Sequence, residues 1–325
     1  MAGVGAPRVS AVIVTHQSAA TIGPCLESLR RQSVPFHEVL VVDSASTDGS
    51  VAAVRQVSLS VRLTVCPHNL GFAAASNLAA RQASGSHLAF LNPDVVLADD
   101  WLACVGAVLP ADMVASQVRS LARPDRVESL GDTWTRCGIP VHRCQGIPVH
   151  AVPAGPRPVL GAPGCAMVVD RLRFADLGGF DEDLFCIHED SDFNLRAARA
   201  GCRCVLVPKA VVYHQGSSSI GRLSEFYVWY GQRNLELVYL RSLPRWALLT
   251  CLPGHLLYEC GAAVFFLSHG RLRTFLSAKW AALAASRRFW HKRRSDLESV
   301  GWCRLRPMCD EPCFAGRWAQ KARAR

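Results

Sequence analysis

The stretch Leu88-Ala-Phe-Leu-Asn-Pro-Asp94 decides the fold that this sequence predicts. Its first four residues form an apolar run, which is typical of a buried strand. Pro93 then turns the chain, because proline fixes its own φ and keeps the preceding residue out of the α region. Asp94 therefore follows a strand end, at the sheet edge where α/β proteins bind ligands. A Pro-Asp turn alone is more often structural, so the interpretation depends on the neighbouring segments.

Apolar strands alternate with helical segments on the N-terminal side of this stretch. The predicted strands and helices, in chain order, are strand 9–15, helix 21–32, strand 38–43, strand 61–66, helix 69–82 and strand 86–92. Strands and helices that alternate at this short spacing predict a parallel sheet wound by crossovers. No Gly-x-Gly-x-x-Gly follows the first strand, so the dinucleotide-binding fingerprint is missing.

Polar side chains end three of these strands, namely Thr15, Asp43 and the Asn92–Asp94 turn. The carboxyl ends of parallel strands meet at one edge, so we expect these side chains to share a crevice. Asp43 is suited to accept hydrogen bonds from a base N–H or a ribose hydroxyl. An equally weighted alternative is that Asp43 only caps the turn that leads to Asp48.

Six carboxylates lie within the twelve residues from Asp181 to Asp192. Acids at a helix N-terminus are favoured by the helix dipole, which accounts for one or two of them. Crowded carboxylates also raise one another's pKa, as a general base requires. His214 ends a strand predicted over 210–214, after another over 204–208. A strand-end histidine is more often structural; the alternative is that His214 shares a divalent metal with Asp94.

The remaining segments are less regular. A helix is predicted over 101–109 and a strand over 113–120, whereas residues 121–160 have no clear period and predict a functional or mobile stretch. Residues 159–169 return to the core, and their glycines allow close approach of the backbone to a ligand.

Composition divides the 325 residues into two parts of different charge. The formal net charge is +10, and residues 222–325 hold 18 Lys and Arg against 7 Asp and Glu, so this last third carries the whole excess. Such asymmetry predicts an anionic partner, either nucleic acid or a membrane surface.

The 14 cysteines are dispersed without a Cys-x-x-Cys, and residues 1–10 lack an apolar leader, which favours a reducing cytosol. Cys303, Cys309 and Cys313 lack a good fourth ligand for zinc.

The C-terminal third predicts helices. One is expected over 226–240. Residues 246–267 are apolar enough to span a membrane, but we expect Pro253-Gly254 to split them. Basic and aromatic residues alternate from Arg271 to Arg294, which suits a helix lying in a membrane interface; the alternative is an ordinary helical cap with a solvated basic face.

Four motifs in order resemble the family 2 glycosyltransferases with the GT-A fold, and specifically their rhamnosyltransferase-like branch. They are Val42–Ser50, Asn69–Asn77, Leu91–Asp94 and Phe180–Phe193, followed by Arg196, Gly201 and His214. The resemblance covers about residues 8–240. It implies an α/β fold with a Rossmann-like, mostly parallel sheet flanked by helices. We expect a GT-A catalytic domain over 1–222, a membrane-interface helical region over 223–300 and a poorly ordered basic tail over 301–325.

The same resemblance implies roles for individual residues. Thr15 and Asp43 match nucleoside contacts; Asn69, Gly71 and Asn77 match the segment along the ribose and diphosphate; Asn92 and Asp94 occupy the first and last positions of a metal-binding Asp-x-Asp. Asp94 and His214 would hold Mg²⁺ or Mn²⁺, with one charge fewer because of Asn92. Asp190 matches the catalytic base, and Glu189 would support it or orient the acceptor.

The implied activity is inverting transfer of a sugar, rhamnose in the nearest branch, from a dTDP-, UDP- or GDP-sugar to a saccharide or polyprenyl-linked acceptor. It implies cell-envelope polysaccharide synthesis at the cytoplasmic face of the plasma membrane, without nucleic acid as a partner. A sugar nucleotidyltransferase is the first alternative, but Thr15–Ala20 offers no Gly-rich basic loop for a triphosphate. A non-catalytic nucleotide-binding paralogue is the second, and the intact Glu189-Asp190 pair argues against it.

Overall fold

The computed structural model describes residues 8–216, 221, 223–243 and 245–293. The basic tail predicted over 301–325 and the Cys303–Cys313 cluster lie outside the described residues. Ten described cysteines are free thiols, and Cys137 is disulfide-bonded.

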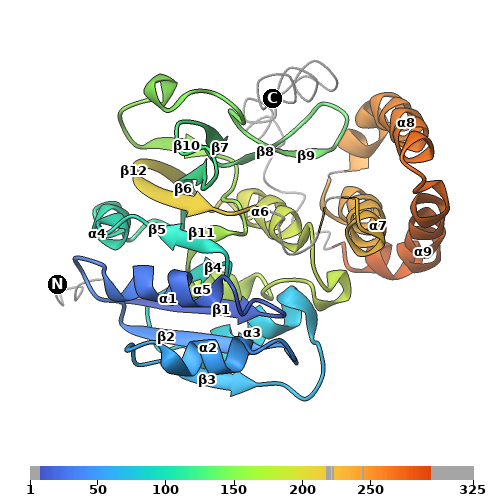
Figure 1. The fold of residues 1–325 in the computed structure, drawn as a ribbon. Helices are drawn as coiled ribbons and strands as arrows, with labels where there is room; N and C mark the ends of the chain where they lie inside the picture. Colours follow the sequence, from blue (N-terminus) through green and yellow to red (C-terminus); the bar gives the residue numbers. More distant parts are fainter. Residues whose placement is uncertain (1–7, 217–220, 222, 244, 294–325) are drawn as a thin grey trace.

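A ten-stranded sheet forms the centre of the molecule, in the order β10-β12-β6-β11-β4-β1-β2-β3, with β5 paired to β12 and β7 to β6 (Figure 1). The strands of its N-terminal half are β1 (Val9–Thr15), β2 (Glu38–Asp43), β3 (Arg62–Val65), β4 (His87–Leu91) and β5 (Val95–Leu97). The others are β6 (Met113–Ser120), β7 (Val127–Ser129), β10 (Arg157–Val159), β11 (Ala166–Asp170) and β12 (Cys204–His214).

The predicted parallel arrangement is confirmed for β3, β2, β1 and β4, whose carboxyl ends share one edge. β11 runs antiparallel between β4 and β6, and β12 is again parallel to β6. The prediction of two strands at 204–208 and 210–214 was wrong. They form one strand, β12, whose register shifts between Val207 and Val211. Pro208 explains the irregularity, since proline cannot donate to the ladder and is confined to edges and bulges.

Helices cover both faces of the sheet. They are α1 (Ile22–Arg30), α2 (Ser50–Gln56), α3 (Gly71–Gln82), α4 (Trp101–Gly106), α5 (Arg171–Asp176) and α6 (Glu189–Arg199). Successive strand residues point to opposite faces, so β1 contributes Val12 to one apolar core and Ile13 to the other. The α/β class predicted from the sequence is therefore confirmed.

Residues 121–160 are more ordered than predicted. Besides β7 and β10 they contain a two-stranded hairpin, β8 (Asp132–Trp134) and β9 (Pro140–His142), and a 3₁₀ turn over Val149–Ala151. Trp134 and Ile139 are buried. Three-residue strands are too short to show an alternating pattern, which is why the sequence predicted an irregular stretch.

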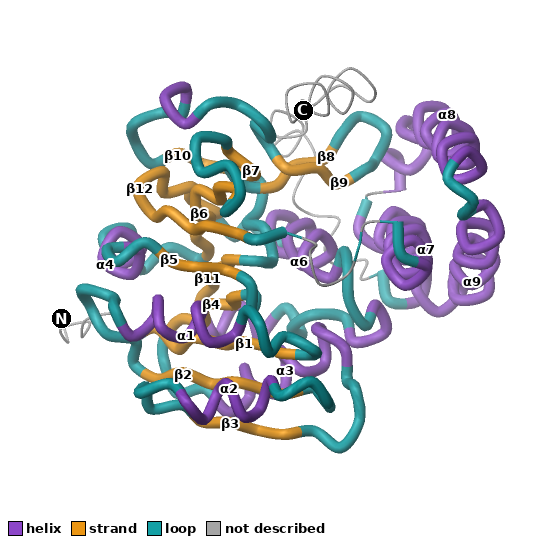
Figure 2. Tube along the Cα trace, in the orientation of Figure 1, coloured by secondary structure: helices purple, strands orange, loops and turns teal. Residues whose placement is uncertain are grey.

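Three long helices, α7 (Glu225–Ser242), α8 (Arg245–Ser268) and α9 (Leu272–His291), form a layer beside the carboxyl edge of the sheet (Figure 2). The predicted break at Pro253 was wrong, because α8 continues through it. Pro253 is exposed, so water can hydrate the carbonyl group that loses its intrahelical donor.

These helices share an apolar core with the rest of the chain. Leu237 of α7 and Phe289 of α9 pack with Leu195 of α6 and Trp134 of the hairpin, and Leu243, the residue after α7, joins them. The domain boundary expected at residue 222 stays a prediction.

Candidate active site

Two buried polar atoms without a hydrogen-bond partner lie side by side at the carboxyl edge of the parallel strands. Thr15 ends β1 opposite Asp43, which ends β2, and both residues are fully buried. Asp43 Oδ1 accepts from the backbone N–H of Ser46 at 2.9 Å, as its predicted capping role requires. Asp43 Oδ2 and Thr15 Oγ1 have no partner, although buried polar groups normally do. These atoms therefore remain available to a polar ligand.

The next segment runs from Asn69 into α3. Asn69 is exposed, and its Oδ1 accepts from Ser44 Oγ at 3.0 Å and from the Gly71 N–H at 2.9 Å. Asn77 is directed away from solvent, and its amide holds Phe180 by two hydrogen bonds and Glu182 by a third. Asn77 thus ties α3 to the acidic segment, and its role as a ligand of a donor stays a prediction.

Asp94 and His214 meet because β5, which follows the Asn-Pro-Asp turn, pairs with the end of β12. Asp94 Oδ1 is buried without a hydrogen-bond partner and lies 3.5 Å from His214 Nε2. His214 Nδ1 lies 3.1 Å from Glu128 Oε1 of β7. Burial disfavours the charged imidazole, but the Asp94 and Glu128 carboxylates outweigh burial and raise the pKa of His214 to about 10.

This donor set fits a divalent cation. A carboxylate oxygen and an imidazole nitrogen are ligands that Mn²⁺ accepts, and the second imidazole nitrogen faces a carboxylate, as in many metal-binding histidines. The orphaned Oδ1 of Asp94 is the structural observation that supports this fit. Glu128 was missed in the sequence because it lies on a three-residue strand within the stretch predicted to be irregular.

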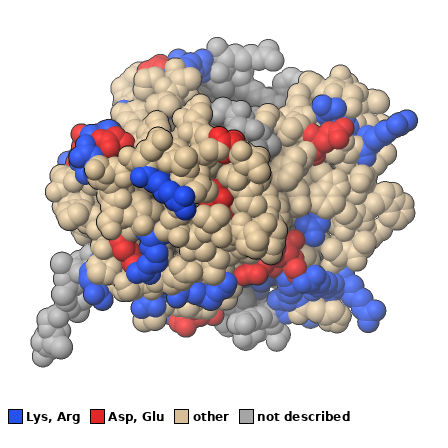
Figure 3. Space-filling model, turned by 60° about the horizontal axis from the view of Figure 1, so that its bottom comes forward, with Lys and Arg blue, Asp and Glu red and all other residues tan. Residues whose placement is uncertain are grey.

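Four of the six acids between Asp181 and Asp192 are paired with cations. Their pairs are Asp181 with Arg241 and Lys292, Glu182 with Arg81, Asp183 with Arg288 and Lys292, and Asp192 with Arg196 and Arg241. Figure 3 shows acidic and basic side chains side by side toward the side where the C-terminal helices lie. Glu189 and Asp190 are the two acids of this segment without a cationic partner among the described residues.

Glu189 and Asp190 begin α6. Glu189 is buried, and its Oε2 has no hydrogen-bond partner. Burial and then the charge of Asp190 raise the pKa of Glu189 well above its usual range. Asp190 is half-buried and accepts from the Gly164 N–H at 2.8 Å and the Ser191 N–H at 2.6 Å. The pair therefore combines a buried acid with a raised pKa and a carboxylate held in place by backbone donors.

The turn Pro163-Gly164-Cys165 connects Asp190 with the Asn-Pro-Asp turn. Gly164 donates to Asp190, and the carbonyl oxygen of Cys165 accepts from the Asn92 N–H at 3.0 Å. Burial raises the pKa of the Cys165 thiol, and four nearby carboxylates raise it further: Glu128, Asp94, Asp132 and Asp190. The Asn92 backbone, two residues before Asp94, and the Asp190 carboxylate thus bond to the same turn.

The β8–β9 hairpin adds a histidine–carboxylate pair that sequence reasoning missed. His142 Nδ1 lies 2.7 Å from Asp132 Oδ1. Burial opposes protonation, but the charge of Asp132 and its hydrogen bond prevail and raise the pKa of His142 to about 8, with smaller effects from Glu128 and Asp190. No sequence motif marks these residues.

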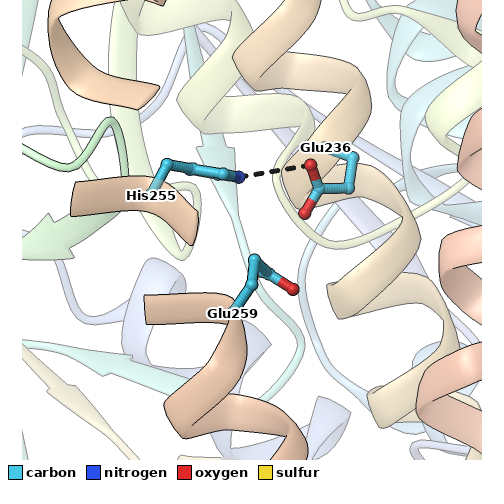
Figure 4. A group of neighbouring side chains, drawn as sticks. All are labelled: Glu236, His255 and Glu259. Atoms are coloured by element: carbon cyan, nitrogen blue, oxygen red, sulfur yellow. Dashed lines mark hydrogen bonds and ion pairs between the residues drawn. The ribbon is translucent and has the colours of Figure 1, made fainter. Parts of the chain in front are cut away.

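A second histidine–carboxylate group lies between the C-terminal helices. Glu236, His255 and Glu259 point toward one another, and His255 Nε2 lies 3.2 Å from Glu236 Oε2 (Figure 4). Lys279 Nζ lies 2.6 Å from a carboxylate oxygen of both Glu236 and Glu259. The ammonium group already pairs with both acids, so this group is a half-buried ion-pair network rather than a metal site. Lys279 consequently does not belong to the basic face predicted for this helix.

We expect Gly71→Ala to destabilise the protein by about 1–3 kcal/mol. Gly71 has φ +73°, and a Cβ there would lie 2.5 Å from Phe185 Cδ2 and 2.6 Å from the Phe185 carbonyl oxygen. Chemical denaturation measures the loss. Gly23→Ala in α1 is the matched control, because nothing lies within 4 Å of its Cβ position. Equal stability of the two variants would contradict the predicted clash.

Comparison with known proteins agrees with this geometry. A family model described as glycosyl transferase family 2 matches residues 10–115. The chain carries a family 2 glycosyltransferase domain. It is 29% identical over 243 residues to N-acetylglucosaminyl-diphospho-decaprenol L-rhamnosyltransferase of Mycobacterium tuberculosis, a match that covers 65% of this chain and 77% of the relative.

Two further similarities agree on the family and the fold. The chain is 28% identical over 231 residues to the O-antigen biosynthesis protein RfbC of Myxococcus xanthus; this match covers 66% of the chain but only 18% of that longer protein. The mannosyltransferase PcManGT of Pyrobaculum calidifontis, solved with GDP-Man and Mn²⁺, matches with a TM-score of 0.52 at 22% identity and covers 88% of each chain. The predicted GT-A fold and glycosyltransferase family are confirmed.

Proposed function

We propose that this glycosyltransferase moves a sugar, rhamnose in the first instance, from a nucleotide diphosphate sugar to a saccharide carried on a polyprenyl diphosphate. The observation that carries the proposal is the carboxyl edge of the sheet, where Thr15 Oγ1, Asp43 Oδ2 and Asp94 Oδ1 are buried without a hydrogen-bond partner and the Asn92 N–H bonds to the turn that holds Asp190. The printed name of the Mycobacterium relative supplies the sugar and the lipid class.

Thr15 and Asp43 would bind the nucleoside, since their buried orphan oxygens match the N–H and hydroxyl groups of a base and ribose. Asn69 and Gly71 would lie along the ribose and diphosphate, where Gly71 permits the tight approach of Phe185. Asn77 would contribute indirectly, because its side chain holds Phe180 and Glu182 in place. Asn92 would contact the donor sugar diphosphate beside Asp94.

Asp94 and His214 would hold a divalent cation, with Glu128 orienting the imidazole. When bound, Mg²⁺ or Mn²⁺ neutralises charge that develops on the leaving diphosphate. Asp190 would accept the proton of the acceptor hydroxyl while that oxygen attacks the anomeric carbon and the bond to the diphosphate breaks. A single displacement of this kind inverts the anomeric configuration, and the buried Glu189 beside Asp190 would help to orient the acceptor.

The test of the function is a donor panel of dTDP-, UDP- and GDP-sugars with N-acetylglucosaminyl-diphospho-farnesol and Mn²⁺. We expect transfer from dTDP-rhamnose with inverted anomeric configuration, detected by mass spectrometry and NMR, and its loss in excess EDTA. Release of pyrophosphate from a nucleoside triphosphate would instead indicate a nucleotidyltransferase. Nucleotide binding without turnover of any donor would indicate a non-catalytic paralogue.

We further propose that α8 and α9 dock on the cytoplasmic face of a membrane. α8 is long and apolar enough to cross a membrane, and only 11% of its most apolar window is buried. Leu249, Val264 and Trp280 are 73%, 67% and 71% exposed. Arg288 and Lys292 form ion pairs with Asp183 of the same chain. The apolar side chains, more than the basic ones, would therefore provide the affinity for the membrane.

Co-sedimentation with lipid vesicles tests this docking. We expect the wild type to bind both zwitterionic and anionic vesicles, and Leu249→Asp combined with Val264→Asp to weaken binding at least about tenfold, because two leucine-sized burials are lost. Leu172→Asp on α5 is the matched control, since Leu172 is 63% exposed and lies outside α8 and α9. Equal sedimentation of all three proteins would contradict docking through these helices.

A further inference from the structure

A groove of about 440 Å³ lies between the first turns of α7 and α9. Aromatic side chains line its α7 side, and polar side chains line its α9 side: Phe226, Trp229 and Tyr230, and Arg273, Thr274 and Ser277. Glu225 also borders the groove and lies 3.9 Å from Arg271. Both helices follow the last strand of the sheet, so the groove is separate from the sheet edge that carries the nucleotide-sugar site proposed above.

The groove is connected to the proposed base through Phe185. The Phe185 ring stacks on Tyr230 with centroids 5.0 Å apart, and Tyr230 contacts Phe226 at 4.7 Å. The Phe185 carbonyl oxygen accepts from the Ala73 N–H at 3.0 Å, so this ring stands between α3 and α7. Asp190 lies five positions after Phe185, a chain segment that spans at most about 18 Å.

The lining suits a ligand with an anionic and an apolar part. Arg273 is exposed and makes no hydrogen bond or ion pair with the described residues, so its guanidinium is available to a phosphate. Phe226 is 38% exposed, and Trp229 is half-buried under Arg233, with 5.5 Å from the Arg233 guanidinium carbon to the ring centroid. The flat rings of Phe and Trp side chains pack well against the hydrocarbon of a ligand. Exposed leucines also lie on α8, which ends at Ser268, shortly before α9 begins at Leu272.

We propose that this groove binds the diphosphate and first isoprene units of the acceptor's polyprenyl carrier. Arg273 contacts the diphosphate, and Phe226, Trp229 and Tyr230 bury the isoprene units. The saccharide then reaches past Phe185 toward Asp190, while the rest of the lipid follows the apolar surface of α8. This inference rests on the proposed function and adds the place where the carrier lipid is recognised.

Calorimetric titration with farnesyl diphosphate, without vesicles, tests the proposal. We expect the wild type to bind, and Arg273→Ala and Trp229→Ala each to weaken binding by about tenfold or more, the value of one charge-assisted hydrogen bond or a large aromatic contact. Arg287→Ala and Trp280→Ala on α9 are the matched controls and should bind as the wild type does, because neither residue lines the groove. Arg273 is exposed, so its substitution leaves the fold intact; circular dichroism checks Trp229→Ala.

Two other readouts separate this proposal from the proposed function. Binding of the nucleotide sugar with Mn²⁺ should be unchanged in Arg273→Ala. Failure of the wild type to transfer sugar from any donor of the panel overturns the proposed function, while farnesyl diphosphate binding is still measured. Absence of wild-type binding, or equal loss in the controls, overturns the groove. Inorganic pyrophosphate that binds as tightly as farnesyl diphosphate also overturns it, because the aromatic side chains would then contribute nothing.

Discussion

Replacing Asp190 by asparagine is expected to lower the rate of sugar transfer about 10²–10⁴-fold, the usual contribution of a general base, without weakening nucleotide binding. Asp190 is the acid of its segment that has no cationic partner among the described residues and is fixed by the Gly164 and Ser191 N–H groups. Asparagine keeps the shape of the side chain and one acceptor oxygen, but it cannot take the acceptor proton. Initial transfer rates and calorimetric titration with the nucleotide measure the two quantities.

Glu182→Gln is the matched control for Asp190→Asn. Glu182 lies in the same acidic segment, and its side chain is 52% exposed and faces Arg81 at 3.7 Å. Glutamine preserves an oxygen that can accept from Asn77, so transfer should continue at the wild-type rate. If Asp190→Asn lost nucleotide binding together with activity, Asp190 would instead be a structural tie between α6 and the Pro163–Cys165 turn.

Replacing Asp192 by asparagine is expected to lower the free energy of unfolding by about 3–5 kcal/mol, because it breaks a buried ion pair. Asp192 is fully buried; its Oδ2 accepts from Arg196 at 2.8 Å and from Arg241 at 3.1 Å, and its Oδ1 accepts from Ser242 Oγ at 2.7 Å. The variant leaves the buried guanidinium of Arg196 with only carbonyl partners. Urea denaturation at neutral pH measures the loss, with Glu27→Gln in the exposed Glu27–Arg30 pair as a control that should not change stability.

The pH dependence of this loss follows from the same contacts. Burial opposes the charge of Asp192, but Arg196 and Arg241 prevail and lower its pKa below the usual value. A lowered pKa stabilises the folded state above the unfolded pKa of about 4 and loses that contribution as the pH falls further. The difference between the wild type and Asp192→Asn should therefore be constant from about pH 8 to 5 and shrink below pH 4. A difference that grew on acidification would show that Asp192 is not the charged partner.

The sequence predicted the parts of the fold whose physical signals are local. Apolar runs that end in polar turns located β1, β2 and β4, and the parallel pairing then brought Thr15 and Asp43 together. The sequence also predicted that the Asn-Pro-Asp turn lies near His214. The structure places them together because β5 pairs with β12. These results depend on strand ends, which a single sequence marks clearly.

The remaining features depend on contacts between segments far apart in the chain. Glu128, Asp132 and His142 lie on three-residue strands, which carry no periodic pattern. Lys279 was assigned to a basic surface, but it pairs with two half-buried acids on neighbouring helices. The six acids of the 181–192 segment could not be sorted from the sequence either, since their cationic partners come mainly from α7 and α9.

Asn234 of α7 shows how closely the last helices and the acidic segment over 181–192 depend on each other. Its side-chain amide donates at 2.8 Å to the carbonyl oxygens of Leu184, Cys186 and Ile187, in a loop where three non-glycine residues have positive φ. Such a strained loop holds its shape only while its surroundings hold it. The smallest excised fragment able to perform the reaction should accordingly extend at least through α7, because a shorter one cut after the sheet would lose the three hydrogen bonds that Asn234 gives this loop.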